Sequence, residues 1–99
     1  MKAKMQILSY NPEVLDSASK KVVNAAPDLN LDVVNGPKRV RFNPSREHIK
    51  LYGTDVKDIR MRVITLQGEQ TDIGKVLRMD FAAELKMRGG IYIRLLPTR

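Results

Sequence analysis

The strongest constraint on the fold is a strand pattern in the second half of the chain, Asp58–Gln67, with the sequence DIRMRVITLQ. Its first apolar side chains alternate with Arg60 and Arg62, and a period of two is typical of a strand with two different faces. The far end of the segment, VITL, is apolar on both faces, as expected where a strand passes under a helix. The pattern therefore predicts a sheet covered by helices on one face.

The first covering helix is indicated just after residue 10. Asn11 is a good cap, Pro12 fits the first helical position, and Glu13 lies at the positive end of the helix dipole. Pro27 ends the helix. The predicted buried face consists of Leu15, Ala18, Val22 and Ala25, which recur with a helical period.

A second helix is predicted to begin at Thr71 and Asp72, which we expect to cap it. Gly89 and Gly90 are expected to close it. Its predicted buried stripe consists of Ile73, Val76, Leu77, Phe81 and Leu85.

With the remaining segments, the predicted elements follow one another in the order strand, helix, strand, strand, helix, strand. The further predicted strands are Lys4–Tyr10, a strand that begins at Leu31–Val34 and continues with a break through the basic stretch 34–44, a run that resumes at Arg46–Tyr52, and Ile91–Leu95. This order predicts an α+β protein, a ferredoxin-like β-α-β-β-α-β sandwich. We expect a four-stranded antiparallel sheet with both helices on one face, and an extended basic hairpin. Because that fold hosts many unrelated activities, function has to be argued from a site.

The composition favours a single basic domain over residues 1–99. The chain has 99 residues, a formal net charge of +7 and a sequence pI of about 10.0. Such a charge favours a polyanionic partner, either nucleic acid or an anionic membrane. The chain has no cysteine and one histidine, so disulfides, thiolate catalysis and cysteine metal sites are excluded and His48 cannot form a metal site alone. We expect no metal, no cofactor, no catalytic residue and no small-molecule substrate.

Membranes and targeting signals are also not indicated. No run of apolar residues has the length of a membrane span, and the basic residues lie on predicted strands instead of an amphipathic helix. The start, MKAKMQILSY, has neither the apolar core of a signal peptide nor the pattern of a transit peptide. We expect the protein to be made where it works or to have lost a leader.

The positive charge is concentrated in a predicted hairpin arm, about residues 37–58. Between Lys38 and Arg62 there are eight basic residues and three acidic ones, a net charge of +5. Pro37 and Pro44 are expected to limit the freedom of the arm. Like charges that face each other across strands are destabilising unless an anion lies between them, so the arrangement indicates an anionic partner. The predicted RNA-binding residues are Lys38, Arg39, Arg41, Arg46, His48, Lys50, Arg60 and Arg62.

The mode of binding follows from the scarcity of aromatic residues. The chain has three tyrosines, two phenylalanines and no tryptophan. Single-strand binders of the stacking type need aromatic platforms, so phosphate contacts from Lys and Arg fit this chain better than base stacking.

The sequence resembles the small-subunit ribosomal protein ten family along nearly its whole length. The matching segments are MQILSYNPEVLDSASKKVVNAA, LDVVNGPKRVRF, KDIRMRVITLQ and VLRMDFAAELKMRGGIYIRL. This resemblance implies a structural protein of the small-subunit head, without enzymatic activity, that supports translation. Its partners would be small-subunit ribosomal RNA and neighbouring head proteins.

Departures from the family pattern concern the arm. The family usually has His where this chain has Arg62, and a basic residue where it has Ile64. The proline-rich start of the arm is reduced to Gly36-Pro37, and the arm's tip is short. These differences imply a divergent, mitochondrial member, with the cytoplasm of a bacterium as the alternative location.

Two other functions fit the same fold. A transcription antitermination or regulatory adaptor of the same family would act through its globular face, so loss of Lys38–Lys57 should spare it. A small acyl-phosphate hydrolase would need a phosphate-cradling loop after the first strand, where this chain has SYNPE, without glycine.

Overall fold

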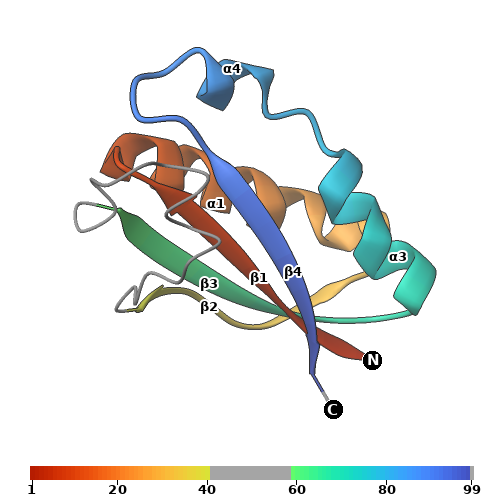
Figure 1. Cartoon of the computed structure of the whole chain (residues 1–99). Coiled ribbons are helices and arrows are strands. Elements are labelled where there is room, and N and C mark those ends of the chain that lie inside the picture. Colours follow the sequence, from red (N-terminus) through yellow and green to blue (C-terminus); the bar gives the residue numbers. More distant parts are fainter. Residues whose placement is uncertain (41–58, 99) are drawn as a thin grey trace.

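The computed structural model describes residues 1–40 and 59–98. The predicted strand Arg46–Tyr52 lies outside the described residues. In chain order the elements are β1 (Lys2–Ser9), α1 (Pro12–Ala25), the 3₁₀ turn η1 (Pro27–Leu29), β2 (Asp32–Val40), β3 (Arg60–Gln67), α3 (Gln70–Gly74), the 3₁₀ turn η3 (Lys75–Arg78), α4 (Ala82–Leu85) and β4 (Tyr92–Thr98) (Figure 1). None of the helices in these two ranges combines the length and apolar character needed to cross a membrane.

The strands form one open antiparallel sheet in the order β2-β3-β1-β4. The central strand β1 pairs with β3 from Lys2 opposite Gln67 to Ser9 opposite Arg60. The predicted α+β class and four-stranded antiparallel sheet are therefore confirmed.

The main core lies between the sheet and its helices (Figure 1). On β1 the side chains of Ala3, Met5 and Ile7 point into it, as the period of two requires. The helical residues of this cluster are Leu15, Ala18, Val22, Ile73, Val76 and Phe81. A smaller cluster consists of Leu8, Ile59 and Met61. Because neighbouring residues of a strand point to opposite faces, this cluster lies on the face of the sheet away from the main core.

Helix α1 matches its sequence signals closely. The Asn11 side chain accepts a hydrogen bond from the backbone N–H of Glu13 at 3.0 Å, and Pro12 is the first helical residue. The helix ends at Ala25, two residues before Pro27. Ala25 is half-buried and Ala26 takes the fully buried place at the end of the stripe.

Strand β2 extends beyond Val34 into the basic stretch, as the sequence predicts. It continues through Gly36 and Pro37 to Val40, which pairs with Met61 of β3. Two register shifts, between Val33 and Asn35 and between Asn35 and Lys38, accommodate the glycine and proline without ending the strand. Residues 37–40 of the predicted arm thus belong to the sheet, and 41–58 lie outside the described residues.

The single second helix predicted from Thr71 is wrong. The segment forms three short pieces, and Thr71 lies inside α3, whose cap is Glu69. Met79 is extended, with φ −64° and ψ 151°, and this breaks the helical period. Asp80 then accepts a hydrogen bond from the N–H of Ala82 at 2.9 Å, which starts a new turn.

The break changes which residues are buried. Ile73, Val76 and Phe81 lie in the core as predicted, but Leu77 is 54% exposed and Leu85 is 64% exposed. Gly89 and Gly90, both with positive φ, lie in the turn that leads into β4 and not at the helix end, which is capped at Lys86.

Glu84 is buried, whereas the neighbouring residue Leu85, which the predicted stripe placed in the core, is exposed. Its carboxylate accepts hydrogen bonds from Ser17 Oγ at 2.8 Å and from Lys21 Nζ at 2.7 Å, both on α1. Lys21 also donates to the carbonyl oxygen of Asp80 at 3.2 Å. This polar contact fixes the C-terminal helical segment on α1.

Candidate nucleic-acid interface

Basic side chains gather where β2 ends and β3 begins. The register places Lys38 opposite Val63 and Arg39 directly opposite Arg62. The two arginines of β3 share one face, as their spacing predicts. Four of the eight predicted RNA-binding residues, Lys38, Arg39, Arg60 and Arg62, lie in this part of the structure, and Arg41, Arg46, His48 and Lys50 lie outside the described residues.

The alternation of the strands divides these four residues between two faces. Arg60 and Arg62 are spaced by two residues from each other and from the core residue Ile64, so they share its face of the sheet, which α1 covers. Arg39 pairs with Arg62 and therefore belongs to the same face. Lys38 has the parity of Val63 and belongs to the other face. The predicted residues therefore do not form one surface.

The helix-side residues border a cleft between α1 and the β2–β3 pair. The cleft is lined by Arg39 and Arg62 from the strands, by Asp16, Ser19 and Lys20 from α1, and by Pro37. Three of these side chains are cationic and one is acidic. The cleft thus has a net positive charge.

Arg62 is unusual among these cations because it is buried. It is 7% exposed, and its Nη2 atom lies 3.8 Å from Asp16 Oδ1, too far for a good hydrogen bond. Its Nη1 atom donates a long hydrogen bond, 3.4 Å, to the carbonyl oxygen of Met61. Within the described ranges, this guanidinium group has no other polar partner.

Lys38 lines a shallow groove on the open face of the sheet. Lys4 of β1 adds a second cation there, and Gln6, Asn35 and Thr65 add polar groups. The groove also contains the apolar side chains Val40, Met61 and Val63. Its chemistry suits a phosphate chain that passes over a partly apolar surface.

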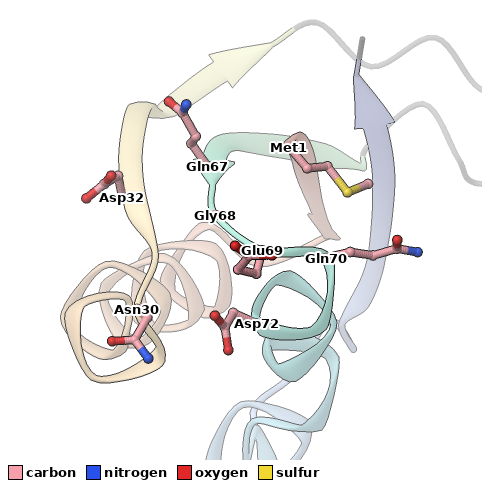
Figure 2. A pocket seen from close by; sticks show the side chains of 8 residues that line it. All are labelled: Met1, Asn30, Asp32, Gln67, Gly68, Glu69, Gln70 and Asp72. Carbon is pink, nitrogen blue, oxygen red and sulfur yellow. The ribbon is translucent and has the colours of Figure 1, made fainter.

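A hollow at the opposite end of the sheet has the opposite charge. It is lined by Met1, Asn30, Asp32, Gln67, Gly68, Glu69, Gln70 and Asp72. In Figure 2 the Asp32 carboxylate points away from those of Glu69 and Asp72, so the three acids do not converge. Among the residues that the structure describes, no group of three or more His, Cys, Asp or Glu side chains is placed to hold a metal ion.

The sequence analysis missed Lys4, Ser19 and Lys20. Ser19 and Lys20 follow Asp16 by three and four residues, so the three share one helix face beside the buried stripe. This polar row at helical spacing was the available signal. It pointed to a site only once the sheet register placed Arg39 and Arg62 next to it.

Comparisons with known proteins identify no relative: no family model matches this chain, and no curated protein matches it.

Proposed function

We propose that the protein binds small-subunit ribosomal RNA as a structural component of the ribosome and has no catalytic role. The observation that carries the proposal is the direct cross-strand pairing of Arg39 with Arg62 at the basic end of the sheet. Two like charges at this position repel each other, and the phosphates of RNA would remove that repulsion. Lys38 and Arg60 extend the same basic end.

We also propose that the protein has a ferredoxin-like fold. An antiparallel sheet in the order β2-β3-β1-β4, with one helix after β1 and helical segments after β3, supports a ferredoxin-like sandwich with a basic hairpin after β2. The hairpin would carry Arg41, Arg46, His48 and Lys50 to the RNA.

The cellular setting follows from the resemblance to the small-subunit ribosomal protein ten family. The body would dock among neighbouring proteins of the small-subunit head, in a mitochondrial ribosome, with the bacterial ribosome as the alternative. An adaptor function of the same family would act through the body and is compatible with this role.

Sedimentation tests the proposal directly. A tagged copy expressed in its own cell type should move with small subunits and intact ribosomes in a sucrose gradient, and should leave them when the salt concentration is raised. If the protein stays at the top of the gradient at low salt, the ribosomal role is wrong. Turnover of an acyl phosphate by the purified protein would contradict the non-catalytic role.

A further inference from the structure

We infer that the cleft between α1 and the β2–β3 pair binds one phosphate of the RNA backbone, held by Arg39, Arg62, Lys20 and Ser19. The inference rests on the proposed RNA binding and deepens it by adding Ser19 and Lys20 of α1 to Arg39 and Arg62, on the helix-covered face of the sheet. The RNA-binding residues predicted from the sequence lie between Lys38 and Arg62, and Ser19 and Lys20 lie outside that segment.

The first argument is the incomplete set of partners around Arg62. A guanidinium group has five N–H donors, and a buried charge is costly unless it is paired and hydrogen-bonded. Within residues 1–40 and 59–98, this group has one hydrogen bond of 3.4 Å and one ion pair of 3.8 Å. A phosphate in the cleft would offer acceptor oxygens in the fork geometry that arginine prefers.

The second argument is an independent one and concerns Ser19. Its hydroxyl group is buried, with the residue 3% exposed, and has no hydrogen-bond partner among the described residues. Ser19 lines the same cleft. A small rotation of the side chain would let the hydroxyl donate to a phosphate oxygen.

The third argument is the charge around the site. Among the described residues that line the cleft, Lys20, Arg39 and Arg62 share it with one acid, Asp16, so one carboxylate is set against three cations. The Asp16 side chain is 61% exposed and lies 3.8 Å from Arg62. A pair of this kind is weak, and a phosphate can displace the carboxylate without a large loss of stability.

The experiment measures the binding of a labelled fragment of small-subunit ribosomal RNA to the full chain. Ser19→Ala and Asp16→Asn are the decisive variants because neither removes a cation. Ser19→Ala should weaken binding on the order of tenfold, since one hydrogen bond to a charged group is lost. Asp16→Asn should strengthen binding roughly threefold, because the competing carboxylate is removed.

Variants that remove a positive charge show how much the cations of the cleft contribute to RNA affinity. Arg39→Ala and Lys20→Ala should each weaken binding on the order of tenfold and lower the salt slope by about 1. Arg78→Ala, at the end of η3, and Lys86→Ala, directly after α4, are matched controls, and both residues are exposed. Thermal unfolding of every variant is the folding control: an unchanged melting temperature means that the substitution acts on binding and not on folding.

The outcomes separate the inference from the proposed function. If the wild-type protein does not bind the RNA, the proposed function and the inference both fail. If it binds and the open-face variant Lys38→Ala weakens binding while Ser19→Ala and Asp16→Asn have no effect, only the cleft is wrong. A shift of the Ser19 and Lys20 amide signals by inorganic phosphate, without any effect of the variants on RNA binding, would assign the cleft to a small anion instead.

Discussion

At the scale of single residues, Glu84 and Leu85 exchange the places that the sequence pattern assigns to them. The predicted stripe buried Leu85 at helical spacing from Phe81, but Leu85 is exposed and Glu84 is buried. Burial alone would raise the pKa of Glu84. The hydrogen bonds from Lys21 and Ser17 outweigh it and hold the pKa below the usual value of 4.5.

This lowered pKa predicts how stability changes with pH. The folded state binds the Glu84 proton less tightly than the unfolded state, so the stabilisation is present above about pH 4.5 and is lost as the pH falls through the lowered pKa. Glu84→Gln should lower the free energy of unfolding by about 2 kcal/mol at pH 7 and flatten its dependence on pH below 4.5. Urea unfolding across this range measures both effects. Asp28→Asn, at an exposed site, is the control and should leave the acid slope as it is in the wild type.

Gly36 is a second position where one residue decides local structure. It has φ +97°, and a Cβ atom there would collide with the carbonyl oxygen of Val63 on the paired strand. Gly36→Ala should therefore lower the free energy of unfolding by about 3 kcal/mol. Gly90 has φ +65° but no neighbour near its Cβ direction, so Gly90→Ala should cost only about 1 kcal/mol. Equal losses in the two variants would show that the collision with Val63 is unimportant.

At the scale of elements, the two helical regions differ in how much of them the sequence could predict. Helix α1 has a cap, an N-terminal proline and a terminating proline at its ends, so its bounds follow from local chemistry. The region after β3 has a helical period but breaks at Met79, where no proline or glycine marks the break. The local hydrogen bond of Asp80 with the N–H of Ala82, together with the tertiary contacts of Lys21 with Asp80 and Glu84, shows why the chain turns there.

The break makes Asp80 important for the second helical region. Its Oδ1 atom accepts the hydrogen bond of the Ala82 N–H, a role like that of a helix cap. Asp80→Ala should lower the free energy of unfolding by about 1 kcal/mol and speed amide exchange at Ala82. Asp80→Asn keeps an acceptor oxygen and should stay within a few tenths of a kcal/mol of the wild type. If both variants lose stability equally, the charge and not the acceptor is what matters.

At the scale of the whole molecule, charge is separated along the sheet. The basic end, with Lys38, Arg39 and Arg60, lies where β2 ends and β3 begins, and the acidic hollow with Asp32 and Glu69 lies at the other end. The sequence could predict the basic segment because charge density is visible in one dimension. It could not predict the division of that segment between two faces, since this depends on the β2–β3 register and its shifts around Gly36.

This polarity predicts which charges control binding to RNA. Lys38→Ala and Arg60→Ala at the basic end should each lower the slope of log affinity against log salt by about 1, because each would release one counterion fewer. Asp32→Asn and Glu69→Gln at the acidic end change the net charge by one unit in the opposite direction and should leave the slope unchanged. A fluorescence titration of labelled ribosomal RNA at several salt concentrations measures these slopes. Effects of equal size and opposite sign at the two ends would mean that RNA responds only to net charge, because a contact made at one end of the sheet must distinguish the two ends.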